Sequence, residues 1–251
     1  MKRAPTTAQQ VWLAYWRYKQ WYHRYSVTGI EHLVDAPPSL IVGYHGRPAA
    51  WDMCMLTAAL YDRLGYLPHA VLNQSIDKFP GGRDLLNALG FVAEEGDALN
   101  AVVRQGEHLV VTPGAATEGS RTFLHRYRVN WGEHLGYLRL ALKHRLPIVP
   151  VGSSGTDDAY IGLIDGLSLG KLLGMPRGWS LWIGFGPLGL FPFSPAFPVR
   201  MHQIIGAAID PWSEPGVHID DRDSLLRLHH RVTAAVQALL DQARAGASQG
   251  N

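Results

Sequence analysis

The sequence predicts an α/β fold in which a largely parallel central sheet is flanked by helices. Short apolar runs alternate with helical patterns from residue 39 to residue 152, and buried parallel strands are typically apolar without interruption. This alternation of strands and helices implies parallel strands joined by crossover helices. The chain has 251 residues, of which 47% are hydrophobic and 18% charged, a composition typical of one globular domain.

Each predicted strand is a short apolar run, and the runs cover residues 39–44, 68–73, 91–93, 107–114 and 146–152. Helical patterns lie between or next to these runs, at residues 51–65, 82–90, 97–106 and 132–145. Farther along, residues 199–210 predict another strand, and residues 220–246 predict an amphipathic helix that begins with aspartates and ends with glycine. The small polar residues 247–251 predict a disordered tail.

Residues 7–25 predict a helix that is entered through Thr6 or Thr7 and is crowded with aromatic side chains. Its charged side chains are all basic: Arg17, Lys19 and Arg24. Tryptophan and tyrosine favour the level of lipid headgroups, and basic side chains favour anionic leaflets. We therefore expect residues 1–25 to form an amphipathic helix that contacts a membrane through residues 7–25. The alternative is a helix packed on the domain, with its basic side chains reaching solvent.

Residues 160–199 are apolar and rich in glycine and proline, and they predict one strand near residues 179–185 within irregular loops. The stretch "GFGPLG", residues 184–189, matches the GxGxxG pattern of dinucleotide-binding folds. That pattern requires a helix whose N-terminus points at the pyrophosphate. Pro187 lies inside the stretch and further prolines follow it, so a helix cannot run through this segment. We therefore exclude a nicotinamide or flavin site.

Charge and cysteine content restrict the partners and the compartment. The formal net charge of +2 is too small to indicate nucleic-acid binding. Cys54 is the single cysteine, so no disulfide can form within the chain, which suits the cytosol. His229 and His230 are adjacent and would point about 100° apart on a helix, so we expect no metal site. Neither a secretory signal nor a membrane-spanning apolar run is visible, and we expect a cytoplasmic protein.

His45 and Asp52 are the first candidate catalytic pair. His45 follows the apolar run 39–44, and sites form where loops leave the carboxyl ends of parallel strands. A histidine can remove the proton of an attacking hydroxyl group when a carboxylate fixes its other ring nitrogen. The alternative is a polar loop histidine near an aspartate that merely suits a helix start. Cys54 is a rival nucleophile, which we interpret as a small core residue.

The loop after the predicted strand 107–114 is the second candidate region. Gly114 can present backbone N–H groups to an oxyanion. Glu118 and Arg121 can fix a polar headgroup. The alternative is a solvent-exposed loop without a role in chemistry.

Three blocks, in order and at regular spacing, carry a resemblance to a known family. They are "YHGRPAAWD" (44–52), "TPGAATEGSR" (112–121) and "YRVNWGEHLGYLRLALKHRLPIVPVGSSG" (127–155), of which the last is the most specific. Over residues 25–210 the chain resembles the glycerolipid acyltransferase superfamily, in the branch that includes diacylglycerol acyltransferase type 2 and monoacylglycerol-acyltransferase-like bacterial enzymes. Two departures are Ala115, where the family's Pro-Gly-Gly block has its second glycine, and His134, where the third block has a basic residue.

The resemblance implies an O-acyltransferase domain over residues 26–246. It would move a fatty acyl group from acyl-CoA or acyl carrier protein to a hydroxyl of a lipid acceptor, with no bound cofactor or metal. His45 would be the general base and Asp52 its orienting partner. The residues expected to bind substrate are Gly46, Pro113, Gly114, Glu118 and Arg121. The enzyme is then expected to lie peripherally on the inner face of the membrane.

A third departure from the family pattern bears directly on the proposed pair. Six residues separate His45 from Asp52, where the superfamily usually has four and the branch often has five. The loop must therefore bulge for Asp52 to reach His45. The alternatives are a lipid-binding protein of the same fold that has lost turnover, and a thioesterase or esterase that uses water. In a lipid enzyme, residues 160–199 would line an acyl tunnel or face the membrane; otherwise they are ordinary core and loops.

Overall fold

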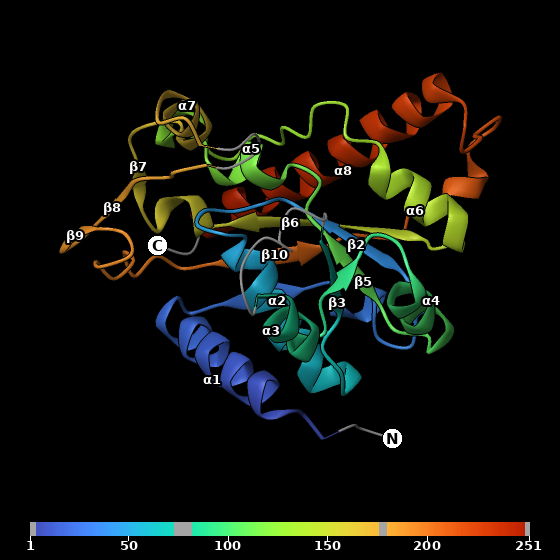
Figure 1. Ribbon diagram of the computed structural model, residues 1–251, viewed down its shortest axis with the longest axis horizontal. Coiled ribbons are helices and arrows are strands. Elements are labelled where there is room, and N and C mark those ends of the chain that lie inside the picture. The colour runs from blue at the N-terminus through green and yellow to red at the C-terminus, as the bar shows by residue number, and fades with distance from the viewer. Residues whose placement is uncertain (1–3, 73–81, 176–179, 249–251) are drawn as a thin grey trace.

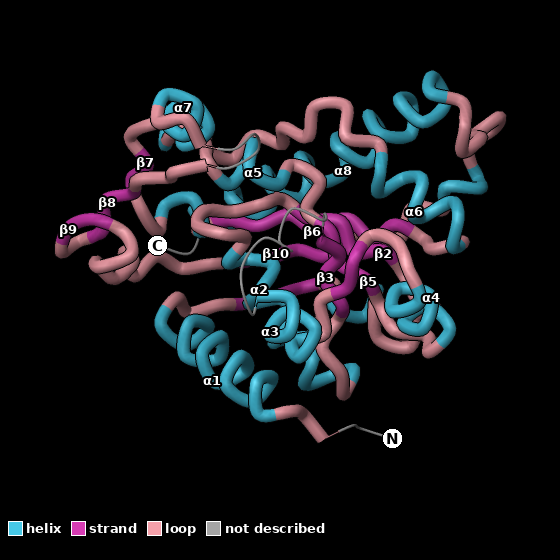
Figure 2. Tube along the Cα trace, viewed as in Figure 1, coloured by secondary structure: helices cyan, strands magenta, loops and turns pink. Residues whose placement is uncertain are grey.

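The computed structural model describes residues 4–72, 82–175 and 180–248, and it contains a central sheet with helices on both faces (Figures 1 and 2). The sheet has the strand order β1-β10-β6-β2-β5-β3-β4. Its strands are β1 Ser26–Thr28, β2 Leu40–Gly43, β3 His69–Leu72, β4 Val92–Ala93, β5 Leu109–Val111, β6 Ile148–Ser154 and β10 His202–Ile205. Neighbours are parallel except β10 and β6. The predicted largely parallel sheet is therefore confirmed.

The α-helices of the described part are α1 Thr7–Tyr22, α2 Trp51–Leu64, α3 Gly82–Leu89, α4 Asp97–Arg104, α5 Ala115–Gly119, α6 Gly136–His144, α7 Gly166–Leu172 and α8 Arg222–Ser248. Short 3-10 turns lie at η1 Ile30–His32, η3 Phe123–His125, η4 Thr156–Asp158 and η5 Pro211–Ser213. The long predicted helices and strands are all present, with ends that differ by a few residues. Within the described residues, no helix is both long and apolar enough to cross a bilayer.

The central strands are buried on both faces, as β2 illustrates. Leu40 and Val42 join an apolar cluster with α6 and α8, whereas Ile41 joins a cluster with α2. Successive side chains of a strand point to opposite faces, so a strand covered on both sides requires an uninterrupted apolar run. Figure 1 shows α6 and α8 above the sheet and α2 below it.

Helix α1 forms a further layer outside α2. It begins with a capping box, in which the Thr6 hydroxyl accepts the Gln9 N–H and the Gln9 side chain accepts the Thr6 N–H. Trp16 is buried against the domain. The helix ends at Tyr22, three residues before the predicted end, because Arg24 has a φ of 46° and the chain turns there into β1.

A second, antiparallel sheet contains β7 Ile161–Gly162, β8 Gly184–Gly186 and β9 Gly189–Leu190. The GxGxxG stretch forms the β8–β9 hairpin, and turns follow it. The reason for excluding a dinucleotide site is therefore confirmed. The strand expected near residues 179–185 begins only at Gly184, and residue 179 lies outside the described residues.

Helices α5 and α7 lie in segments that were predicted to be loops. Asp165 starts α7 by accepting the N–H groups of Leu167 and Ser168. Glycines within α7 lower its helix propensity and explain why the pattern was missed. Helix α8 continues to Ser248, so it extends two residues into the tail predicted at 247–251, and residues 249–251 lie outside the described residues.

Candidate active site

The loops that leave the carboxyl ends of β2, β5 and β6 meet at one edge of the central sheet. His45 follows β2, α5 follows β5, and η4 follows β6. The His45 N–H donates to Glu118 Oε2 at 2.9 Å, which joins the first two loops. Arg121 Nε donates to Asp157 Oδ2 at 3.2 Å, which joins the second loop to the third. The two candidate regions of the sequence therefore lie together, as expected for the ends of parallel strands.

The His45 ring is half-buried, and one of its nitrogen atoms has no hydrogen-bond partner among the described residues. That atom is Nδ1, which is buried. A Cβ atom added at Gly119 would lie 2.7 Å from Cε1 and 2.9 Å from Nδ1 of His45, so the ring packs directly on the Gly119 backbone. Burial, followed by the charge of Arg121, lowers the pKa of His45 from 6.5 to about 4. The imidazole is therefore neutral near pH 7 and able to accept a proton.

Asp52 is fully buried, and its two oxygens bind groups other than the His45 ring. Oδ1 accepts the Gly46 N–H at 3.2 Å, and Oδ2 accepts the Ser153 hydroxyl at 2.5 Å. Burial raises the pKa of Asp52 to about 6, although the bond from Ser153 opposes this shift. The expected contact between the Asp52 carboxylate and the His45 ring is not among the hydrogen bonds of the described residues. Asp52 instead fixes the backbone N–H of Gly46, the residue that follows His45.

The extra residues between His45 and Asp52 form a bulge, but Asp52 makes no hydrogen bond to the His45 ring among the described residues. Ala49 and Ala50 have φ values of 48° and 53°, and both are left-handed. This conformation costs roughly 1 kcal/mol or more for each alanine. Helix α2 begins directly after them, at Trp51, and Asp52 lies buried in its first turn.

Glu118 is buried and bridges two loops through backbone N–H groups. Its Oε1 accepts the Asn130 N–H at 2.8 Å, while Oε2 accepts the His45 N–H. Burial raises the pKa of Glu118 to about 7, and the charge of Arg121 opposes that shift. The carboxyl also packs against the backbone of Gly114, which has no room for a side chain. Next to Gly114, the Pro113 carbonyl accepts a hydrogen bond of 3.0 Å from His134 Nδ1.

Arg121 and Arg47 share the buried carboxylate of Asp157. Arg47 Nε lies 3.3 Å from Asp157 Oδ1, and Arg121 Nη2 lies 3.1 Å from the same atom. Arg121 Nη2 also donates to the His45 carbonyl at 3.0 Å. Burial would raise the pKa of Asp157, but the two guanidinium groups hold it below its usual value. Asp157 therefore compensates part of the positive charge of the two buried guanidinium groups.

Several residues of this network were not among the predicted site residues. Asp157 accepts hydrogen bonds from Arg47, Arg121, the Tyr44 hydroxyl and the Tyr127 N–H. Arg47 and Tyr44 lie inside the block that carries the first motif, and Asp157 follows the strand of the third block. Their position directly after strand ends could have marked them as candidate site residues. The sequence could not show that Tyr44 and Arg47 bond to Asp157, because the two segments lie on different strands.

Cys54 lies outside the network. It is half-buried on α2, and burial raises the pKa of its thiol well above the usual value. A thiol that resists ionisation is a poor nucleophile. This finding favours the interpretation of Cys54 as a packing residue.

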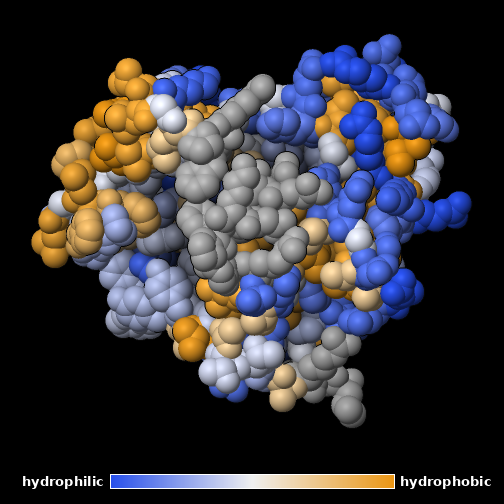
Figure 3. Space-filling view, viewed as in Figure 1, coloured by the Kyte–Doolittle hydropathy of each residue, from blue (hydrophilic) through white to orange (hydrophobic). Residues whose placement is uncertain are grey.

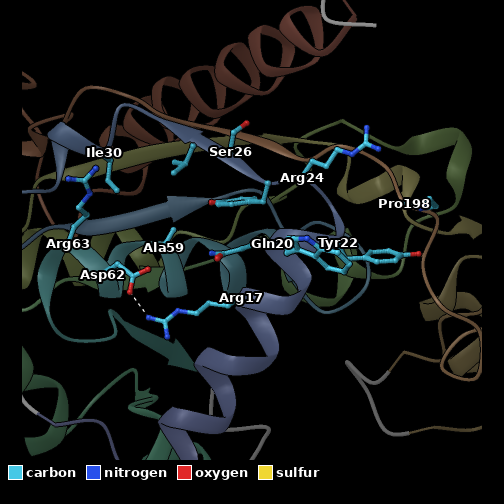
Figure 4. A pocket seen from close by; sticks show the side chains of 13 residues that line it. Arg17, Gln20, Tyr22, Arg24, Ser26, Ile30, Ala59, Asp62, Arg63 and Pro198 are labelled. Carbon is cyan, nitrogen blue, oxygen red and sulfur yellow. Dashed lines mark hydrogen bonds and ion pairs between the residues drawn. The ribbon is translucent and has the colours of Figure 1, made fainter.

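A cavity of about 910 Å³ lies away from this edge of the sheet, between α1, β1 and α2 (Figure 4). Arg17, Tyr22 and Arg24 are among the residues that line it, and Arg17 pairs there with Asp62. None of the predicted site residues lines it. The cavity therefore does not enlarge the candidate active site.

The fold is that of PlsC-type acyltransferases. The crystal structure of the 1-acyl-sn-glycerophosphate (LPA) acyltransferase PlsC from Thermotoga maritima matches with a TM-score of 0.51. The match covers 92% of this chain and 79% of that chain, at 16% sequence identity. At this identity the likeness establishes the fold alone.

The chain belongs to the acyltransferase family, whose model matches residues 24–154. The predicted membership of the glycerolipid acyltransferase superfamily is thereby confirmed. A Bos taurus protein named "DGAT1/2-independent enzyme synthesizing storage lipids" is 25% identical over 224 residues, or 88% of this chain and 60% of the relative. An uncharacterized Mycobacterium leprae protein is 27% identical over 234 residues, or 91% of this chain and 62% of the relative. The chain thus spans about three fifths of the length of these relatives.

Proposed function

We propose that this protein transfers a fatty acyl group from an acyl thioester to a hydroxyl group of a lipid acceptor. The observation that carries the proposal is the neutral His45 imidazole, with one nitrogen unused, at the carboxyl end of a central strand. Family membership and relatives named for storage-lipid synthesis support the same chemistry. The acyl donor is acyl-CoA or acyl carrier protein, and the protein requires no bound cofactor or metal.

His45 acts as the general base in the proposed reaction. Its ring takes the proton of the acceptor hydroxyl while the oxygen attacks the thioester carbonyl. When the tetrahedral intermediate collapses, the carbon–sulfur bond breaks and the thiolate takes the proton back from the imidazolium. A positioned base of this kind contributes about 10²–10⁴ in rate.

The remaining predicted residues fall into two roles. Asp52, Glu118 and Arg121 position the His45 loop, because each is buried and bonded to backbone groups in or next to it. We assign Gly46 to the same positioning role, because its N–H already donates to Asp52 and is not free to bind substrate. Pro113 and Gly114 line the side of the site where the thioester carbonyl binds, and the Gly114 N–H donates to the oxyanion. An oxyanion donor contributes about 10²–10³ in rate.

Lipid acceptors require access to a membrane, and we propose that the protein lies peripherally on the cytoplasmic face. Helix α1 carries basic and aromatic side chains on residues that reach solvent. Side chains of these two kinds favour the interface of anionic bilayers.

Release of free thiol from acyl-CoA, measured with and without a lipid alcohol, tests the proposal. We expect acceptor-dependent release by the wild type and a loss of about 10²–10⁴-fold for His45→Ala. His230→Ala, an exposed histidine on α8, is the matched control and retains full activity. Release without an acceptor would identify a thioesterase, and lipid binding without release would identify a binding protein. Full transfer by His45→Ala would contradict the mechanism.

A further inference from the structure

The cavity between α1, β1 and α2 has the walls of a binding site and plays no part in the proposed reaction (Figure 4). Its volume of about 910 Å³ lies within the range of about 300–1,000 Å³ that is common for small-molecule sites. Arginine side chains line it together with aromatic and aliphatic ones. Small-molecule sites are typically built in this way, from apolar walls and a few convergent polar groups.

The walls of the cavity are held in place by contacts within the protein. Gln20 Nε2 on α1 donates to the Met55 carbonyl on α2 at 2.8 Å. The hydroxyl of Tyr25, which directly precedes β1, donates to Gln203 Oε1 on β10. The cavity is therefore formed before any ligand binds.

The cavity carries an excess of positive charge. Arg17, Arg24 and Arg63 line it, and Asp62 is the one acidic side chain among its described lining residues. Asp62 pairs with Arg17. Arg24 and Arg63 make neither an ion pair nor a side-chain hydrogen bond with another described residue. Two guanidinium groups are therefore free to bind an anion, and the guanidinium group matches the geometry of phosphate.

The turn at the end of α1 has an arginine where glycine is usual. Arg24 has a φ of 46°, in the left-handed region that favours glycine or asparagine. The Arg24 N–H donates to the Trp21 carbonyl at 3.1 Å, and the Tyr25 N–H donates to the Gln20 carbonyl at 2.8 Å. This turn brings to one cavity Trp21, Tyr22, Arg24 and Tyr25. A strained residue that supplies an unpaired charge to a cavity indicates a role in binding.

The basic and aromatic groups are spread over the length of the cavity. Figure 4 shows Asp62 and Arg63 at one end and Tyr22 and Arg24 at the other. Trp21 also lines the cavity and is 75% exposed, so its ring is not part of the core. Figure 3 shows side chains of intermediate or low hydropathy around the end of α1, unlike the hydrophobic ones gathered over α7 and β7–β9. The end of α1 therefore suits a planar aromatic group, because such groups stack on aromatic rings and guanidinium planes.

The cavity is connected to the His45 loop through buried side chains. Tyr25 bonds to Gln203, which lies opposite Ser153 in the pairing of β10 with β6. The Ser153 hydroxyl donates to Asp52, which accepts the N–H of the residue after His45. A ligand in the cavity therefore lies next to the network that positions His45 but outside the candidate active site.

We propose that this cavity binds a nucleotide. The phosphates contact Arg63 and Arg17, and the base stacks on the aromatic side chains and the Arg24 guanidinium at the end of α1. The nucleotide is either free or the adenosine diphosphate part of coenzyme A, which offer the same chemistry from two sources. The inference goes beyond the proposed function and does not depend on acyl transfer.

Isothermal titration of the full chain with ADP tests the inference. We expect ADP to bind and to raise the melting temperature, because a ligand of the folded state stabilises that state. Arg63→Ala and Arg24→Ala should each weaken binding about tenfold through the loss of a guanidinium contact. Trp21→Ala should weaken it about tenfold through the loss of stacking. Arg139→Ala, an exposed arginine of α6 on the opposite face of the sheet, is the matched control and should bind ADP like the wild type (Figure 1).

Two further ligands distinguish a nucleotide site from a general anion site. Inorganic phosphate or sn-glycerol 3-phosphate that binds as tightly as ADP would overturn the inference, because neither carries an aromatic ring. No binding of ADP, or equal binding by the wild type and the three variants, would also overturn it. His45→Ala should bind ADP like the wild type, so a failure of acyl transfer leaves this result standing.

Assays of acyl transfer identify the source of the nucleotide. Inhibition by ADP that is competitive with acyl-CoA, and weaker in Arg63→Ala, identifies the acyl donor as the occupant. ADP that binds without such competition identifies a separate soluble ligand. In both cases the titration measures binding directly, whether or not the protein transfers acyl groups.

Discussion

His45 and His108 lie at opposite ends of central strands and meet different surroundings. His45 follows the carboxyl end of β2, and its Nδ1 is buried without a partner. His108 precedes the amino end of β5, and both of its ring nitrogens are bonded. Nδ1 accepts the Ser39 N–H at 3.1 Å, and Nε2 donates to the Leu33 carbonyl at 3.0 Å.

The difference shows how burial alone fails to identify a catalytic histidine. Burial lowers the pKa of both rings, so both are neutral near pH 7. The His108 ring is saturated with hydrogen bonds and can only hold the chain together. At His45 the protein instead binds the backbone N–H and carbonyl of the residue and leaves the buried Nδ1 of the ring without a partner.

The largest effect is expected for His45→Ala. Acyl transfer should fall by about 10²–10⁴-fold because the general base is lost. The melting temperature should change little, since the ring makes no hydrogen bond that the fold needs. Thiol-release assays and thermal melts measure the two quantities, and a variant that is equally active would remove His45 from the mechanism.

Asp157→Ala should destabilise the protein more than any other single change in the network. It leaves the guanidinium groups of Arg47 and Arg121 buried without a carboxylate. Breaking a buried ion pair in this way costs about 3–5 kcal/mol. Urea unfolding measures the loss, and Asp158→Ala, at a half-exposed neighbour, is the control. A loss of unfolding free energy smaller than that of Asp158→Ala would show that the ion pairs of Asp157 do not stabilise the site.

His108→Ala should have the converse effect to His45→Ala. Two buried backbone groups, the Ser39 N–H and the Leu33 carbonyl, lose their partner, at a cost of about 1–3 kcal/mol in unfolding free energy. Acyl transfer per folded molecule should be unchanged at low temperature. If this variant lost transfer while keeping its stability, the contrast between the two histidines would be wrong.

The pH dependence of stability should distinguish His45 from an exposed histidine. Its folded pKa of about 4 lies below the usual 6.5, so between these values the unfolded chain binds a proton that the folded protein does not. Stability is therefore lost as the pH falls from 6.5 towards 4. Relative to the wild type, His45→Ala should gain about 1–2 kcal/mol between pH 7 and pH 5. Urea titrations at the two pH values measure this difference, and a constant difference would contradict the burial of the ring.

Glu118→Gln should have the smallest effect. Burial already raises the pKa of Glu118 to about 7, so removal of the charge costs little. The amide keeps one acceptor oxygen, and one of the N–H groups of His45 and Asn130 loses its bond, at about 1 kcal/mol. A modest decrease in both stability and transfer is expected. A loss of transfer as large as that of His45→Ala would place Glu118 in direct contact with substrate.

The candidate site could be predicted in part from sequence. The motif blocks placed His45, Asp52 and the Pro113–Arg121 loop at strand ends, and the structure brings them together. A bulge between His45 and Asp52 also followed from the count of residues, but the bond that it was expected to allow between their side chains is not found among the described residues. The acceptors for Asp52 could not be predicted, because Ser153 lies 101 positions away and its approach depends on the packing of β6 beside β2. Helix α7 was missed because its glycines hide a helical pattern.

The sequence by itself determined the α/β architecture, the strand ends that carry the site, and the family. Apolar periodicity and turn residues are properties of neighbouring positions, so they can be read along the chain. Only the tertiary structure decided that Arg47 and Arg121 both pair with Asp157, that Asp52 accepts the Gly46 N–H, and that the buried Nδ1 atom of His45 has no hydrogen-bond partner among the described residues. Those outcomes depend on which side chains meet in the interior, where each buried polar group takes the nearest available partner.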